Sequence, residues 1–131
     1  MNRFPITILA TLILTLCGCA SIDISHKGAT MIEIENTGWY LFNVIPIASG
    51  DPTKPNENSY CLFKDTVTLE NNMMMLKNAM KHEGPVKAVN ITSYTTDENI
   101  FVILLKRYAY HTSAELMYES QKSLIKDDRN L

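Results

Sequence analysis

One helix pattern stands in the middle of this 131-residue chain, and runs typical of β-strands lie on both sides of it. Its apolar residues recur at spacings of four, three and four, namely Leu69, Met73, Leu76 and Met80. Thr68 can cap the first turn, Gly84 is placed as the αL residue after the end, and Pro85 prevents continuation. A helix with one apolar face has to pack on another layer, and the flanking runs predict that this layer is a sheet.

Two strand runs precede the helix. Met31, Ile32 and Ile34 alternate with Glu33 and Glu35, which predicts a strand with one wet face, and residues 36–38 have the chemistry of a turn. Residues 39–48 are nearly all apolar and predict a buried strand or strand pair, with Pro46 at an edge or a bulge. Residues 49–59 contain two prolines and indicate a surface loop, and residues 60–63 indicate a short strand.

Further strands are expected after the helix. Residues 86–94 predict a strand, residues 95–99 a polar turn, and the six apolar residues 100–105 a central strand covered on both faces. Thr112 and Glu115 have the spacing of a capping box, which allows a second helix from Ser113 toward Lys126. The pattern as a whole predicts an α+β fold, in which one helix packs on a small antiparallel-rich sheet.

Length and composition limit the chain to one compact domain, expected over residues 30–125 with a frayed tail over 126–131. The chain is 46% hydrophobic and 20% charged, which is ordinary globular usage. Its net charge of -2 and scattered basic residues argue against a nucleic-acid partner. The five glycines lie far apart, so a phosphate-binding glycine loop is not expected either.

The N-terminus has the pattern of an export signal. A short start containing Arg3 precedes an apolar run from Phe4 to Leu16, and Cys17, Gly18 and Cys19 follow. The alternative, a permanent transmembrane helix, needs about 20 apolar residues, and this run ends short of that. Export is therefore expected.

The residues Leu16-Cys17-Gly18-Cys19 resemble the lipobox of bacterial lipoproteins. The resemblance implies a signal peptide over residues 1–18, cleavage between Gly18 and Cys19, and a diacylglyceryl thioether on Cys19, usually with a further acyl chain such as palmitate on the new amino group. Two or three acyl chains make a stable membrane anchor, whereas one holds only marginally. An ordinary signal peptidase site near Cys17 or Ala20 would instead leave Cys19 a plain thiol. Residues 19–29 are expected to form a tether.

The residues after Cys19 bear on the membrane that is reached. In Gram-negative lipoproteins an aspartate at the next position is the usual signal for retention in the inner membrane, and Ala20 and Ser21 stand here instead. The resemblance therefore implies an outer-membrane anchor with the domain facing the periplasm, if the source is Gram-negative. The expected partners are the membrane itself and an envelope protein or polymer.

Metal or cofactor binding is not expected from the residue spacings. Met73, Met74 and Met75 offer thioethers, but consecutive helical residues point about 100° apart and cannot converge on one copper ion. The three histidines, His26, His82 and His111, have no metal-ligand spacing among them.

No catalytic group stands out either. After processing, Cys61 is the only thiol left, and it is expected to be a buried small hydrophobe or to form an intermolecular disulfide. Asp97 and Glu98 could act as an acid–base pair only if a turn held them across a substrate. A small envelope hydrolase using Cys61 or this acidic pair is the alternative to a non-enzymatic binding module.

A partner is expected to bind where the apolar run over residues 39–48 meets the loop over 49–59. Pro46 cannot donate a ladder hydrogen bond, so this part of the strand should lie at a sheet edge, which can accept an added strand or an apolar anchor. The candidate partner-binding residues are Trp39, Asn43, Pro46, Ser49 and Thr53. The alternative is that Trp39 and Phe42 belong to the core.

Overall fold

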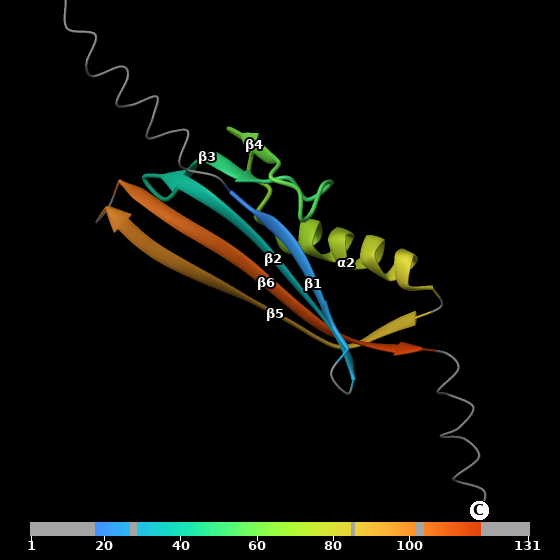
Figure 1. The fold of residues 1–131 in the computed structure, drawn as a ribbon. Coiled ribbons are helices and arrows are strands. Elements are labelled where there is room, and N and C mark those ends of the chain that lie inside the picture. The colour runs from blue at the N-terminus through green and yellow to red at the C-terminus, as the bar shows by residue number, and fades with distance from the viewer. Residues whose placement is uncertain (1–17, 27–28, 85, 102–103, 119–131) are drawn as a thin grey trace, which may run out of the picture.

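The computed structural model describes residues 18–26, 29–84, 86–101 and 104–118. They form six strands and one helix (Figure 1). The elements in chain order are β1 (Ala20–Ser25), β2 (Thr30–Leu41), β3 (Ile45–Gly50), β4 (Tyr60–Leu62), α2 (Leu69–Glu83), β5 (Val86–Phe101) and β6 (Leu105–Tyr118). The frayed tail expected over 126–131 lies outside the described residues.

All six strands belong to one sheet, and every neighbouring pair is antiparallel. Its main path runs β4-β3-β2-β6-β5, and β1 pairs with β2 off this path. Residues 20–25 pair with 31–36 of β2, and β3 pairs with 38–41, so β1 and β3 lie end to end along the same edge of β2. The long strands cross the whole molecule, while α2 covers one side of the sheet (Figure 1).

The expectation of an α+β fold with room for a second helix is wrong. The described residues form an antiparallel sheet with a single helix, and residues 113–118 continue β6. Thr112, Ala114 and Leu116 are buried at a spacing of two, which is the period of a strand. Pairing with β2 on one side and β5 on the other outweighs the local capping-box preference. Residues 119–126 of the expected helix lie outside the described residues.

The expected tether is also wrong for residues 20–25, which form β1. Ile22 and Ile24 pack against the core, while Asp23 between them is exposed, and Ala20 is buried. The Ile-Asp-Ile alternation is a strand pattern of three residues, too short to stand out by itself. It becomes a strand because the edge of β2 beside it is otherwise unpaired.

The strand expected at Met31–Glu35 is confirmed within β2, but the turn expected at residues 36–38 is wrong. β2 continues to Leu41, with Asn36 and Thr37 both buried. The side-chain amide of Asn36 donates to the carbonyl of Thr66, and the backbone amide of Thr37 donates to the carbonyl of Cys19 at 2.7 Å. Both polar groups bond to segments distant in the chain, so they do not bend their own backbone into a turn.

Of the two alternatives expected for residues 39–48, the strand pair forms, but the run is not buried as expected, because Phe42, Val44 and Ile45 are exposed. β2 ends at Leu41, and Val44 donates back to the Leu41 carbonyl at 3.2 Å across a turn in which Phe42 and Asn43 both have positive φ. That combination is the type I′ geometry that matches the twist of antiparallel strands. Pro46 comes directly before a bulge at Ile47, because Trp39 pairs with Ala48 whereas Tyr40 pairs with Pro46.

The loop before the helix is shorter than expected. Ser49 and Gly50 belong to β3, and the short strand expected at 60–63 is β4. Within the loop, the Asp51 carboxylate accepts from the Thr53 hydroxyl at 2.6 Å and from the Thr53 amide at 3.0 Å. These hydrogen bonds to the charged form lower the pKa of the Asp51 carboxyl.

The helix is confirmed with both of its ends. Thr68 accepts from the Asn71 amide at 3.2 Å, and α2 ends before Gly84. Gly84 has a φ of 94° and a ψ of -151°, so it occupies a region open to glycine but not the αL conformation that was expected. The ends of a helix are set by local chemistry, which explains this agreement with the sequence.

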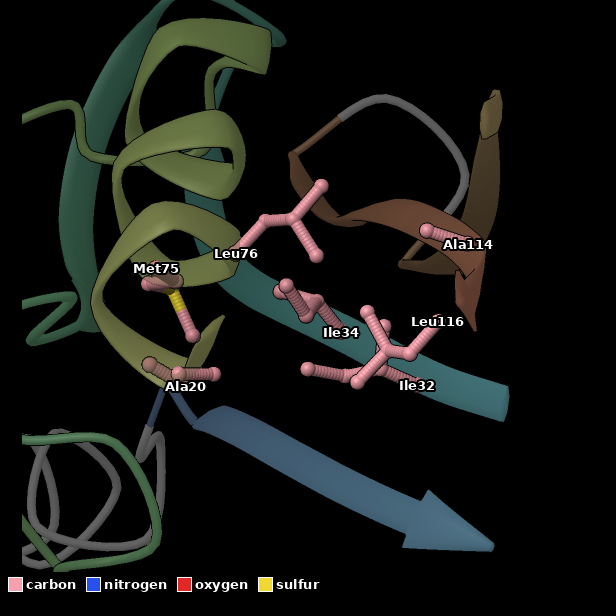
Figure 2. Close-up of a cluster of buried hydrophobic side chains, with 8 residues drawn as sticks. Ala20, Ile32, Ile34, Met75, Leu76, Ala114 and Leu116 are labelled. Carbon is pink, nitrogen blue, oxygen red and sulfur yellow. The ribbon is translucent and has the colours of Figure 1, made fainter. Parts of the chain in front are cut away.

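The apolar face of the helix is rotated from the predicted one. The buried helix residues are Asn72, Met75, Leu76 and Ala79. Of the predicted stripe, Leu76 is buried and Met80 partly buried, whereas Leu69 and Met73 are exposed. In Figure 2, Leu76 points toward Ile34 of β2, whereas Met75 extends toward Ala20; all of these residues belong to one core cluster with Ile32 and Leu116.

The second hairpin departs from the predicted boundaries. The strand expected at 86–94 is confirmed, but the turn expected at 95–99 is wrong, because β5 runs through to Phe101. Ile100 to Leu105 is not a central strand. It spans the end of β5 and the start of β6, with Phe101 opposite Leu105, and Ile100 and Leu104 are exposed.

Candidate functional site

The cysteine expected to carry the lipid lies against the folded body. Its amide donates to the Thr37 hydroxyl at 2.8 Å, its carbonyl accepts from the Thr37 amide, and its residue is exposed. The neighbouring Ala20 carbonyl accepts from the Asn56 amide at 2.9 Å. The backbone at Cys19 is therefore fixed to β2 and to the loop before β4.

Two glycines permit this close approach. A Cβ on Gly50 would lie 2.3 Å from the Cys19 carbonyl carbon, and one on Gly18 would lie 2.4 Å from the Ser49 backbone. Neither distance is physically possible without moving backbone, so glycine is required at both positions for the chain to enter β1 along this path.

The structure does not bring the predicted partner-binding residues together. Ser49 is fully buried and donates to the Lys64 carbonyl at 2.7 Å, so it cannot belong to an exposed partner surface. Trp39 is half-buried and points to the opposite sheet face from Ser49, because it pairs with Ala48. Asn43 is exposed in the β2–β3 turn, Pro46 is half-buried, and Thr53 is exposed with its hydroxyl bonded to Asp51. The edge expected at β3 lies one strand farther out, at β4.

The residues named for a hydrolase lie apart. Asp97 and Glu98 are consecutive in β5 and point to opposite faces of the sheet. Asp97 pairs with Lys106 at 2.7 Å, and Glu98 pairs with Arg107 at 3.8 Å. Cys61 is half-buried in β4, three strand spacings, or about 14 Å, from the strand that carries His111.

Potential metal ligands are likewise dispersed. Met73 is exposed, Met74 half-buried and Met75 buried, so their thioethers diverge as the helix geometry requires. Within the described ranges, no three side chains of His, Cys, Asp or Glu are grouped closely enough to hold a metal ion. His111 lies in the middle of β6, not near a strand end.

A hollow lies on the sheet face turned away from α2, which we call the open face. It has a volume of about 330 Å³ and spans four strands. Its polar lining comes from alternate residues of those strands, Ser21, Asp23, Glu33, Tyr94, His111 and Ser113. A second hollow of about 160 Å³ adjoins it and shares Glu35 and His111. The two form one groove across β2, β6 and β5.

His111 occupies the centre of this groove. Its ring stacks on Tyr94 with centroids 4.7 Å apart and planes 13° from parallel, and its Nε2 lies 2.9 Å from the Thr96 hydroxyl. Glu35 is its cross-strand neighbour on β2, and Tyr94 is its neighbour on β5. Flanking partners on both strands hold the ring in one orientation.

Some of the carboxylates in the groove have a cationic partner and others do not. Arg107 lies 3.8 Å from both Glu35 and Glu98, and these exposed pairs contribute little to stability. Among the described residues, neither Asp23 nor Glu33 has a cationic side chain within 4.0 Å. The groove therefore offers two unpaired carboxylates, serine hydroxyls and an aromatic ring, which suit a ligand with hydroxyl or ammonium groups.

A separate aromatic cluster lies on the other face of the sheet. Tyr40 and Tyr108 meet edge to face at 5.0 Å, and the Tyr40 hydroxyl donates to Asp65 at 2.6 Å. Lys106 lies 4.7 Å above the Tyr108 ring. Burial, together with the Asp65 hydrogen bond, raises the pKa of the Tyr40 hydroxyl. A hollow of about 240 Å³ beside this cluster is lined by Asn43 as well.

Sequence reasoning missed the groove. The available signals were the polar alternation in residues 31–35 and the mostly polar run over residues 92–98. Such alternation indicates wet strand faces, but only the pairing of β5 and β2 with β6 brings Tyr94, His111 and Glu35 side by side.

No helix in the described part of the chain is long and apolar enough to span a bilayer. No protein-family model, curated protein or solved structure matches the chain. The functional proposal therefore rests on the sequence and on the geometry of the described residues.

Proposed function

We propose that this protein is a lipid-anchored module of the bacterial cell envelope that acts by binding an envelope protein or polymer. The lipobox pattern at residues 16–19 supports the anchor. The position of Cys19 agrees with it, because its side chain is exposed and the folded body begins at the next residue. An amide nitrogen hydrogen-bonded to Thr37 tolerates acylation, since an acylated amino group keeps one N–H.

The groove on the open face carries the proposal of a binding role. Its lining combines polar side chains from four strands with an aromatic ring, Tyr94, and includes the two unpaired carboxylates. Convergent polar groups around a hollow are the ordinary mark of a binding site. The hydrolase alternative lacks comparable support, because Asp97 and Glu98 face opposite sides of the sheet and Cys61 lies far from His111.

Site-specific photo-crosslinking in cells tests the binding role. A photo-reactive amino acid at Glu33, in the groove, is compared with one at Asn78, exposed on α2. We expect an adduct at Glu33 that is absent at Asn78 and that Glu35→Gln with Tyr94→Ala diminishes. Digestion with protease or with a glycan hydrolase then identifies the partner as protein or polymer. Equal capture at the two positions would refute the groove as the binding surface.

The anchor is tested by phase partition of whole-cell protein in detergent. The full chain should partition into the detergent phase, and Cys19→Ala should shift it to the aqueous phase, because the short apolar segment alone holds a membrane poorly. Cys17→Ala is the matched control and should partition like the unaltered protein. Detergent partition that survives Cys19→Ala contradicts the proposed acceptor.

A further inference from the structure

Exposed apolar side chains gather at one end of the sheet and along its β4 edge. They come from the β2–β3 turn and from β4 with the residue after it. We define them as the apolar margin: Phe42, Val44, Ile45, Tyr60, Leu62 and Phe63. Val44 is 76% exposed and Phe63 73%, the highest values among the large hydrophobic residues that the structure describes. Several large apolar side chains exposed along one margin mark a surface that meets another apolar phase.

Backbone hydrogen bonds fix the apolar margin in place. The Phe63 amide donates to the Ile47 carbonyl at 3.0 Å, which extends β4 alongside β3. The Phe42 amide donates to the Leu104 carbonyl at 3.0 Å, which joins the turns of the two hairpins at the same end of the sheet. Leu104 is exposed there as well. The margin is therefore part of the rigid body.

The margin begins beside the anchoring cysteine. Tyr60 pairs with Gly50, and Gly50 lies against the backbone of Cys19. Cys19 bonds to Thr37, and β2 continues from there to Leu41, four residues or about 13 Å farther at about 3.3 Å per residue, with Phe42 directly after it. Apolar side chains thus extend from the level of the anchor to the tip of the hairpin.

We propose that the apolar margin lies in the surface of the same bilayer that holds the lipid on Cys19. This inference rests on the proposed lipid anchor. With Cys19 fixed to Thr37 and β1 starting at Ala20, no tether separates the body from the bilayer. The margin residues nearest the anchor therefore meet lipid before any other partner. Phenylalanine, tyrosine and branched aliphatic side chains suit the boundary between headgroups and acyl chains.

Docking on the margin fixes the orientation of the protein. No residue of the margin lines the hollow around His111, so the binding groove and the bilayer contact are separate surfaces. A body held at both the lipid and the margin cannot swing about Cys19. The groove would then lie at a fixed distance from the bilayer surface and face a fixed direction.

The test uses the full processed protein in vesicles of phosphatidylethanolamine and phosphatidylglycerol, with and without nitroxide-labelled lipid. An environment-sensitive fluorescent amino acid is placed at Val44, at Phe63, or at Ile91. Ile91 is the matched control, because it is apolar and exposed but lies on β5, at the opposite edge of the sheet. Mass spectrometry of the same samples establishes whether Cys19 carries acyl chains.

We expect nitroxide lipid to quench the probes at Val44 and Phe63 several times more strongly than the probe at Ile91. Val44→Asp should reduce quenching at Phe63 while Cys19 remains acylated. If Cys19 is acylated and all three probes are quenched alike, the margin does not dock and this inference fails, although the anchor stands. If Cys19 is unacylated, the proposed anchor fails, and this inference fails with it because it places the margin in the bilayer that holds that lipid.

Discussion

Two methionines of α2 provide the sharpest test of how the helix packs. Met75 is 0% exposed and lies in the core cluster with Ile32 and Ile34, whereas Met73 is 37% exposed. The sequence pattern alone assigns the core position to Met73. Replacing each by alanine makes the same chemical change in the same helix, so the difference in helix propensity cancels.

The expected losses differ because only one side chain leaves a cavity. Met75→Ala removes a fully buried side chain and should lower the free energy of unfolding by about 2 to 5 kcal/mol. Met73→Ala should change it by less than about 1 kcal/mol, since more than a third of its surface is already in water and its removal leaves no enclosed cavity. The core is small enough that neighbours cannot close the gap at Met75 without moving β2.

Urea titration of the soluble protein over residues 19–131, followed by far-ultraviolet circular dichroism, measures both losses. With a slope of about 1 to 3 kcal/mol per molar urea, the Met75→Ala midpoint should fall by at least about 0.7 M. The Met73→Ala midpoint should stay close to that of the unaltered protein. Equal shifts, or a larger shift for Met73→Ala, would show that the helix face described above is wrong.

Three further perturbations test the core, the entry of the chain and the aromatic cluster. Asn72→Asp should destabilise by about 2 to 5 kcal/mol at neutral pH, because it puts a charge in a fully buried site, and acid titration below the unfolded carboxyl pKa should restore much of the loss. Gly50→Ala should cost about 1 to 3 kcal/mol, since its Cβ meets the Cys19 backbone, and proteolysis should then release residues near β1 first. The pKa of Tyr40 is raised above its ordinary value of 10.0 by burial and by Asp65, so the folded state keeps this tyrosine neutral. The contribution of Tyr40 to the free energy of unfolding is fully present below pH 10.0. It declines as the pH rises above that value, where the tyrosine ionises in the unfolded chain. Tyr40→Phe should flatten that decline, and an alkaline unfolding series with the same slope in both proteins would contradict the assignment.

Local chemistry made the helix ends and the first hairpin predictable. Thr68 and Gly84 act within one turn of the chain, and Pro46, which has no N–H to donate, lies directly before the bulge at Ile47. The face of the helix was not predictable in the same way. Asn72 is buried because its amide donates to the Tyr110 carbonyl at 2.9 Å, a contact 38 residues away in the sequence. When a polar residue is buried by a partner distant in the chain, the spacing of apolar residues does not identify the buried face of the helix.

The extent of the sheet depended on long-range pairing too. Residues 20–25 and 113–118 look like a tether and a helix in isolation, yet both pair with β2 or β5. The apolar residues 100–105 read as a central strand because hydrophobicity normally indicates burial. Their place at the end of a hairpin, with Ile100 and Leu104 exposed, could not be foreseen, since exposed apolar residues break that rule.

The candidate site was least accessible to sequence reasoning. Cys19 followed from a four-residue pattern, but the groove needs Tyr94, His111 and Glu35 from three strands. Their spacing in the chain carries no common signal. Ser49 was assigned to a partner surface because it begins a loop-like stretch, and its burial follows from its hydrogen bond to the Lys64 carbonyl.

Mass spectrometry of the N-terminal peptide of the mature protein, purified from membranes of the producing cell, tests the central claim most directly. The account predicts that the chain begins at Cys19, that this cysteine carries a diacylglyceryl thioether, and that its amino group carries at most one further acyl chain. A chain that retains Cys17, or that begins with an unmodified Cys19 or Ala20, would contradict the lipid anchor and the membrane orientation built on it.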